Sequence, residues 1–97
     1  MRRFVLSSEA RTDLLQIQDY IAQDNITAAA TVIDAIFAAF EKLSDHPLMG
    51  HCRADLTSRD VRFWAVYSYL IIYDANTNPL SIVRVLSGYR DITSLLS

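Results

Sequence analysis

The chain begins with a short apolar stretch, residues 3–6, and then changes to a longer repeating pattern. The stretch consists mainly of residues that favour strands, so it predicts a first strand. From Ala10 onward, apolar residues return at steps of four, three and four residues, which is the spacing of one face of an amphipathic helix over about 8–23. Ser7 can cap this helix, and the carboxylate of Glu9 suits its first turn.

A second helical pattern follows after a break of a few residues. Asn25 tolerates a left-handed conformation, and Thr27 can cap the helix that comes next. Over residues 28–43 the chain is rich in alanine, and its larger apolar residues again have helical spacing. The short break predicts that the two helices form an antiparallel hairpin, and the small alanine side chains allow them to approach closely.

The second half of the chain has the character of strands. Pro47 and Gly50 mark a loop after the helices, and β-branched and aromatic residues dominate from residue 61 onward. Local connections between such runs favour an antiparallel meander. The sequence therefore predicts an α+β fold, with an N-terminal strand, a helical hairpin on a three-stranded meander and a short C-terminal tail. The predicted strands of the meander are 61–66, 69–73 and 80–86.

The middle strand of the predicted meander is apolar at every position. Both faces of residues 69–73 therefore need cover, and the helical hairpin can supply it for one face only. Trp64 and Val66 share a face of the neighbouring strand and raise the same question. We predict that an incompletely covered sheet face binds an apolar partner. The alternative is that the tail and the tyrosine side chains suffice as cover.

Length and composition place the chain among small globular proteins that fold without disulfides or structural metal ions. The 97 residues correspond to one domain, 1–97, and 52% of them are hydrophobic. The single cysteine, Cys52, cannot form an intrachain disulfide, which suits a reducing cytoplasm. The basic start is followed by too short an apolar run for a signal peptide, and no stretch is long enough to span a membrane. We therefore expect a cytoplasmic protein with no membrane partner.

The distribution of charged residues argues against direct binding of nucleic acid. Formal net charge is −2, whereas proteins that hold a phosphate backbone usually carry a basic surplus. Eight of the nine basic residues are arginine, and Lys42 is the only lysine. Arginine suits forked contacts to carboxylates, although a local basic patch remains compatible with this composition.

The sequence offers little material for catalysis or for binding a cofactor. His46, His51 and Cys52 are the one possible metal cluster, and their spacing matches no zinc pattern with paired ligands. Ser7 and Ser8 lack the glycine-flanked elbow of a nucleophilic serine. Only two glycines occur, so there is no glycine-rich phosphate loop. We predict no metal, no cofactor and no catalytic residue.

Several short motifs nevertheless occur in one order along nearly the whole chain. They are Leu6–Ser7, Ala10, Asp13–Leu14, Tyr20–Ala22, Pro47–His51 with Arg53, Asp55–Leu56, Val61–Phe63, Tyr69, Ile71 and Tyr73, and finally Arg84–Leu86 with Gly88, Arg90 and Asp91. In this order they resemble the ParE/RelE superfamily of toxins from bacterial type II toxin–antitoxin systems, and the loop at 47–56 is most similar to the ParE branch.

The resemblance implies a toxin that a cognate antitoxin neutralises, with contact to operator DNA only through that antitoxin. ParE-like members are described as poisons of DNA gyrase, whereas RelE-like members cleave mRNA on the ribosome. The ribonucleases carry an arginine where this chain has Leu70, lysines in the middle of the chain, and a tyrosine or histidine near the C-terminus. This chain has no lysine after Lys42 and neither residue after Arg90. A non-catalytic gyrase inhibitor is therefore predicted. A ribosome-dependent ribonuclease and a non-toxic antitoxin-binding relative are the alternatives.

Two sets of contact residues follow from the resemblance together with the strand pattern. Those expected to bind the target protein lie on the last strand and just after it. They are Arg84, Tyr89, Arg90 and Asp91. The competing interpretation for Arg84 is an ion pair with a carboxylate or a place on an open face of the sheet, and for Arg90 and Asp91 it is a structural role in holding the tail. Those expected to bind the antitoxin share one face of two neighbouring strands. They are Arg62, Trp64, Val66, Tyr69, Ile71 and Tyr73.

Overall fold

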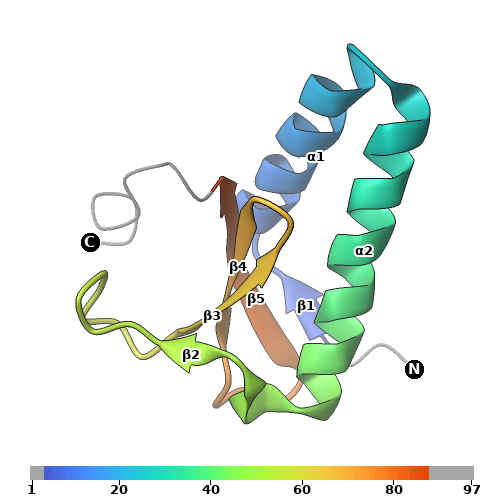
Figure 1. Cartoon of the computed structure of the whole chain (residues 1–97). Helices are drawn as coiled ribbons and strands as arrows, with labels where there is room; N and C mark the ends of the chain where they lie inside the picture. The colour runs from blue at the N-terminus through green and yellow to red at the C-terminus, as the bar shows by residue number, and fades with distance from the viewer. Residues whose placement is uncertain (1–3, 88–97) are drawn as a thin grey trace.

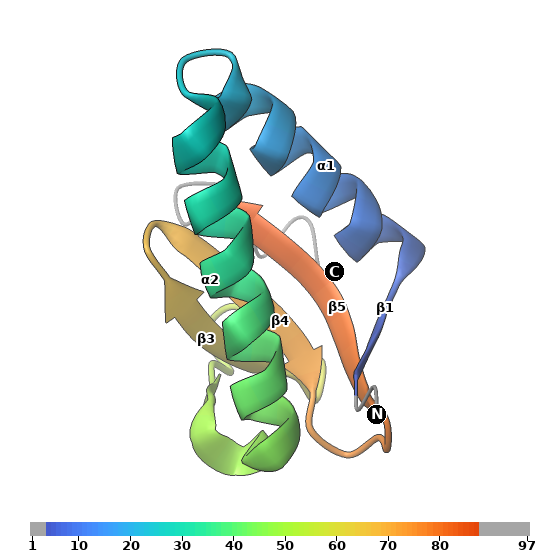
Figure 2. The ribbon, with the colours of Figure 1, turned by 90° about the vertical axis from the view of Figure 1, so that its right-hand side faces the viewer.

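The fold has two layers, with a helical hairpin packed on one face of a single sheet (Figures 1 and 2). The structure, a computed structural model, describes residues 4–87. Its helices are α1 (Ser8–Ala22) and α2 (Ile26–Asp45), and a short 3₁₀ turn, η1 (Pro47–Met49), follows α2. Its strands are β1 (Phe4–Leu6), β2 (His51–Cys52), β3 (Arg62–Val66), β4 (Tyr69–Asp74) and β5 (Leu80–Ser87). The predicted α+β class and the meander of β3, β4 and β5 are confirmed.

The five strands lie in the order β1-β5-β4-β3-β2. The N-terminal strand, whose partner could not be predicted, pairs in parallel with β5, and Phe4 lies opposite Leu80. All other neighbours are antiparallel. The sequence did not predict β2, because a strand of two residues leaves no alternating pattern. A change of register between Ile72 and Tyr73 marks a bulge where β4 pairs with β5.

Each helix begins at a side-chain cap. The hydroxyl of Ser7 accepts the N–H of Ala10 at 2.9 Å, as predicted for the start of α1. The cap of α2 is Asn25, whose side-chain oxygen accepts the N–H of Ala28 at 2.9 Å. The prediction that Thr27 caps this helix is therefore wrong. Asn25 has extended backbone and a short acceptor side chain, so the helix starts two residues earlier.

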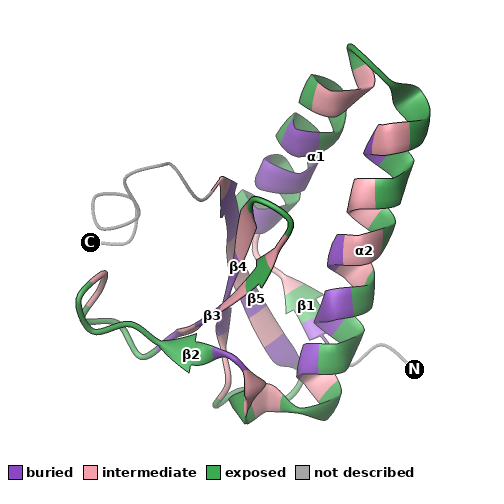
Figure 3. Ribbon diagram, viewed as in Figure 1, coloured by how far each residue is buried: buried purple, intermediate pink, exposed green. Residues whose placement is uncertain are grey.

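The main core lies between the helices and the sheet (Figure 3). Ile36 and Phe40 of α2 and Ile71 of β4 are fully buried there. Phe4, Phe37 and Phe40 form an aromatic group beneath α2, with the rings of Phe4 and Phe40 tilted and their centroids 5.2 Å apart. This core fixes the helix-facing side of β3 and β4, on which the predicted antitoxin contacts lie.

A second, smaller cluster covers the other face of the sheet. It consists of Phe63, Ile72 and Leu86 together with Val61, and Leu56 from the segment before β3 packs against it. Ile72 is 0% exposed and Phe63 4%. The prediction that one face of the middle strand stays uncovered is therefore wrong at the centre of β4. The cause is the irregular segment between β2 and β3, whose isolated apolar residues fold back onto the sheet.

Candidate functional site

The six residues predicted to bind an antitoxin all lie on the helix-facing side of β3 and β4. Residues opposite each other in an antiparallel pair share a face. The register places Arg62 opposite Tyr73, Trp64 opposite Ile71, and Val66 opposite Tyr69. The structure therefore brings these six side chains together, although they come from two separate stretches of sequence.

Two of the six residues are unavailable to a partner. Ile71 and Tyr73 are both 0% exposed and belong to the main core beneath the helices. The prediction that these two residues contact an antitoxin is therefore wrong. The reason is that the helical hairpin covers the inner part of this face completely. Trp64, Val66 and Tyr69 are half-buried at its margin. For these three, contact with an antitoxin stays a prediction.

Tyr73 instead holds the loop that follows α2. Its hydroxyl donates to the carbonyl of Pro47 at 2.7 Å and accepts the N–H of Gly50 at 2.8 Å. Burial raises the pKa of Tyr73 above its ordinary value, with the hydrogen bond from Gly50 acting in the opposite direction. Gly50 is needed here for space, since a Cβ atom at this position would overlap the Tyr73 hydroxyl.

Arg62 holds the same loop from β3. Its Nη1 donates to the carbonyl of Gly50 at 2.8 Å and, more weakly, to that of Leu48 at 3.4 Å. The predicted contact of Arg62 with an antitoxin would have to compete with these bonds. Four hydrogen bonds from two neighbouring strands thus fix the backbone of residues 47–50.

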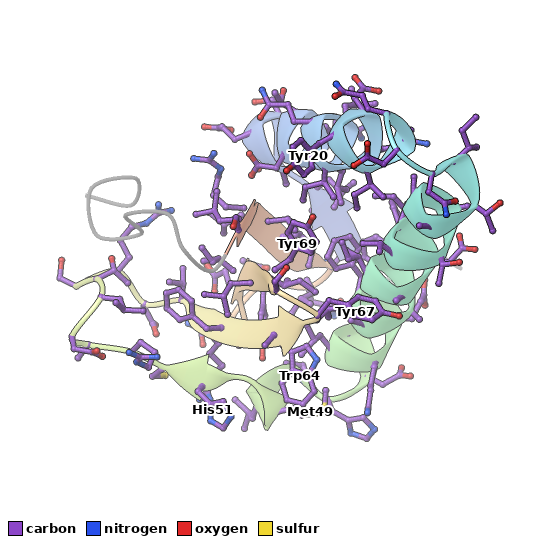
Figure 4. The ribbon with its side chains drawn as sticks, turned by 45° about the horizontal axis from the view of Figure 1, so that its top comes forward. Tyr20, Met49, His51, Trp64, Tyr67 and Tyr69 are labelled. Carbon is purple, nitrogen blue, oxygen red and sulfur yellow. The ribbon has the colours of Figure 1, made fainter. Side chains whose placement is uncertain are left out.

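The fixed loop turns its side chains outward and forms one wall of a shallow hollow. Leu48 is 72% exposed, and Met49 is half-buried against the core. We call this surface the η1 patch; its lining residues are Lys42, His46, Pro47, Leu48 and Met49. Lys42 connects it to β3, because its Nζ lies 5.9 Å from the centre of the Trp64 ring. Figure 4 shows Met49 and Trp64 at the same end of the sheet.

A second group of exposed aromatic residues lies at the opposite end of β4. Tyr67 is 67% exposed and Tyr20 72%. Tyr67 has φ 54°, the only positive φ of a non-glycine residue within 4–87. Tyr20 and Tyr69 line a hollow between α1 and the ends of β4 and β5 (Figure 4). The sequence-based prediction did not single out Tyr67. The feature that could have identified it is a bulky residue in a two-residue hairpin connection that lacks glycine.

Arg84, predicted to bind the target, is engaged inside the protein. Its Nε donates to Asp13 Oδ2 at 2.7 Å and its Nη2 to Asp13 Oδ1 at 2.9 Å. The carboxylate raises the pKa of Arg84. The structure thus supports the competing interpretation of Arg84 as an internal ion pair. The other predicted target contacts, Tyr89, Arg90 and Asp91, lie outside the described residues.

The residues considered for chemistry do not form a cluster. His46, His51 and Cys52 are exposed, and no group of three or more histidine, cysteine or acidic residues within 4–87 is arranged to hold a metal ion. Leu70, at the position where the ribonucleases carry arginine, packs against the apolar cluster on the second sheet face. In the same part of the chain, neither helix is long and apolar enough to cross a membrane.

Comparison with known proteins gives the site its context. A family model described as "ParE toxin of type II toxin-antitoxin system, parDE" matches residues 4–92. The solved structure of a chromosomal ParDE toxin–antitoxin system from P. aeruginosa has a similar fold, with a TM-score of 0.71 and 17% sequence identity over 87% of this chain and 92% of that one. A search of curated proteins found no match. Because the family model spans most of the chain, including both helices and all five strands, the protein belongs to the ParE toxin family of type II toxin–antitoxin systems.

Proposed function

We propose that this ParE-family toxin inhibits DNA gyrase by protein–protein contact and that a cognate antitoxin neutralises it by direct binding. The observation that carries the non-enzymatic part is the engagement of its cationic side chains. Of the six lysine and arginine residues within 4–87, three arginines have internal hydrogen-bond partners. Arg84 binds Asp13, Arg62 binds loop carbonyls, and Arg53 binds Asp55.

Cleavage of RNA through its own 2′-hydroxyl makes demands that these residues do not meet. It needs a base for the hydroxyl, an acid for the leaving oxygen and positive charge near the phosphorane, all within one site. An arginine held by a carboxylate brings little net charge to a phosphate. His46 and His51 are exposed side chains at the loop after α2, and β4, which has Leu70 where the ribonucleases carry arginine, contains no lysine or arginine. Binding of a protein target is the better supported activity.

The aromatic residues at the margin of the sheet support the antitoxin part of the proposal. Trp64, Val66 and Tyr69 are half-buried, and Tyr67 and Tyr20 are largely exposed. Tyrosine and tryptophan are enriched at the centres of protein interfaces, where they provide large contact areas at small entropic cost. The fold resembles that of a protein solved as part of a ParDE system. Action in the cytoplasm, where an exposed thiol such as Cys52 stays reduced, agrees with this assignment.

The experiment that tests the proposed function has two parts. Induced expression of the protein should arrest growth, and co-expression of the adjacent small gene should relieve the arrest. The purified, folded protein should inhibit supercoiling by DNA gyrase. Absence of inhibition over a wide concentration range would contradict the gyrase assignment.

The same cultures distinguish the two alternatives. Primer extension on translated messages after induction would give codon-linked cuts if the protein were a ribosome-dependent ribonuclease. Uncut messages in arrested cells agree with the proposed function. A protein that binds the antitoxin but never affects growth would be a non-toxic relative.

A further inference from the structure

We propose that the η1 patch receives an apolar segment of the antitoxin and that a carboxylate of this segment binds Lys42. The inference rests on the proposed function in one respect, the existence of a neutralising antitoxin. It assigns a position and a chemistry that the family membership does not supply. Its three supports are the rigidity of the loop, the unpaired charge of Lys42 and the continuity of the patch with Trp64.

The backbone of the loop is fixed before any partner arrives. Tyr73 and Arg62 bind the backbone of Pro47, Leu48 and Gly50 through four hydrogen bonds. The tyrosine that makes two of them has no exposed surface. Burying a hydroxyl in an apolar core is unfavourable unless its hydrogen bonds are made, and here both are made to the loop. A loop held in this way loses little conformational entropy when a partner binds to it.

The side chains that this loop presents are those of a contact surface. Leu48 is 72% exposed at the outer end of the loop, whereas its neighbours Pro47 and Met49 are half-buried. An exposed leucine in a mobile loop needs no explanation. An exposed leucine on a backbone fixed from two strands is already in position to enter a pocket or groove of a partner.

The charge at the patch indicates what that partner carries. Lys42 is the only lysine of the chain, and no carboxylate of residues 4–87 forms an ion pair with it. Its Nζ lies over the ring of Trp64, 5.9 Å from the ring centre. Lys42 is the charged side chain among the five residues that line the η1 patch, and none of those five is acidic. An acidic group on the bound segment would complete the contact and would accelerate its association.

Continuity with Trp64 favours the antitoxin over other protein partners. Trp64 shares its sheet face with Val66 and Tyr69, the half-buried residues predicted to bind the antitoxin. Through Lys42 the η1 patch extends that face around the end of β3. One segment of the antitoxin that lies along Trp64 would reach Leu48 without leaving the surface.

The test measures binding of the purified antitoxin from the adjacent gene to full-length toxin variants. Leu48→Asp should weaken binding by about 30-fold or more, because it places a second carboxylate in an apolar contact. Lys42→Met keeps the stem of the side chain against Trp64 and removes only the charge. It should weaken binding by about tenfold and make the affinity less dependent on salt. Leu15→Asp is the matched control, since Leu15 is 60% exposed on α1, and binding should change by less than about twofold.

Growth assays separate the possible occupants of the patch. If the inference is correct, cells expressing the Leu48→Asp toxin stay arrested and the antitoxin no longer rescues them. Loss of toxicity with unchanged antitoxin affinity would assign the patch to the target and overturn the inference. Equal affinities for all variants would overturn it as well, while leaving the proposed function intact. If the unaltered protein fails to bind the antitoxin, both proposals fail together. Circular dichroism and urea unfolding establish that each variant is folded.

Discussion

Asp13 of α1 and Arg84 of β5 form a forked ion pair that ties the first helix to the edge of the sheet. The residues are 71 positions apart, and both carboxylate oxygens are used. Asp13 Oδ2 also accepts the N–H of Val85 at 3.0 Å. The Asp13 side chain is 6% exposed and that of Arg84 20%. The Asp13 carboxylate thus neutralises the Arg84 guanidinium and accepts the N–H of Val85 at the same time.

The position of this pair follows from the length of β1. The short strand β1 ends at Leu6, opposite Ile82, so the edge of β5 beyond that point has no strand beside it. Ser7 donates its hydroxyl to the carbonyl of Val83 at 2.6 Å, and Asp13 takes the N–H of Val85. Two side chains from the start of α1 therefore replace the missing strand. These bonds take the carbonyl of Val83 and the N–H of Val85 out of pairing with another chain.

Replacement of Asp13 should destabilise the protein strongly. In Asp13→Ala, the guanidinium of Arg84 and the N–H of Val85 lose their partners together. Removing one member of a buried pair costs about 3–5 kcal/mol, and the partial exposure of Arg84 reduces this to roughly 2–4 kcal/mol. Urea unfolding followed by circular dichroism measures the change in the free energy of unfolding.

The exposed pair of Arg53 and Asp55 provides the control. It has the same forked geometry, with distances of 2.9 and 2.8 Å, but its side chains are 49% and 63% exposed. Asp55→Ala should change the free energy of unfolding far less than Asp13→Ala does, because water screens an exposed ion pair. Equal effects of the two substitutions would mean that the Asp13 pair contributes no more than a surface ion pair.

Much of the fold was predictable because it depends on local patterns. Three such patterns depend only on residues close together in the sequence. They are the helical spacing from Ala10, the cap at Ser7 and the β-branched runs. The boundaries predicted for α1 and for the strands of the meander accordingly differ from those observed by no more than a residue. Asn25 was misjudged because asparagine suits both a helix end and a helix start, and local pattern does not choose between them.

The candidate site was less predictable because its residues are positioned by distant ones. Strand alternation placed Trp64 with Val66 correctly. It could not reveal that Tyr73 is buried, because the groups that satisfy its hydroxyl lie in a loop more than 20 residues earlier. The role of Arg84 likewise depends on a carboxylate on the first helix. Periodicity shows which face a residue occupies but not how much of that face another element covers.

Removal of the Tyr73 hydroxyl should loosen the loop after α2. Tyr73→Phe leaves the N–H of Gly50 and the carbonyl of Pro47 without this partner. The expected loss of stability is about 1–3 kcal/mol, and amide exchange at residues 48–50 should accelerate. Tyr67→Phe, at an exposed tyrosine, should leave both quantities unchanged. Unchanged exchange in Tyr73→Phe would mean that the loop is held without the hydroxyl.

The raised pKa of Tyr73 predicts a loss of stability in alkaline solution. Because burial raises the pKa in the folded state, the folded protein holds this proton more tightly than the unfolded chain does. The stability linked to the proton is complete below the unfolded pKa of about 10 and is lost as the pH rises through the higher folded value. Unfolding measured between about pH 8 and 11 should show a decline that is shallower in Tyr73→Phe. Parallel curves for the two proteins would contradict this linkage.

Gly50 should tolerate no side chain while Tyr73 is present. Its φ of −74° suits any residue, so backbone strain is not the reason. A Cβ atom would overlap the Tyr73 hydroxyl and lie 2.8 Å from Cε1 of its ring. Gly50→Ala should therefore cost about 1–3 kcal/mol in urea unfolding. In a Tyr73→Phe background the added cost should be smaller, because the nearest atom is gone. Full additivity of the two substitutions would exclude this steric explanation.

Tyr67 should make the protein less stable than a residue that adopts a positive φ more readily would. With φ 54° it occupies the left-handed region, which costs a residue bearing a Cβ about 1–2 kcal/mol and suits glycine or asparagine better. Its side chain is 67% exposed, so little packing is lost on replacement. Tyr67→Asn should raise the free energy of unfolding by about 0.5–1 kcal/mol in urea titrations. At the next position, Ser68→Gly should lower it slightly, since φ there is not positive and glycine adds only unfolded-state entropy. A destabilised Tyr67→Asn protein would mean that the tyrosine ring makes packing contacts that outweigh the strain of its backbone.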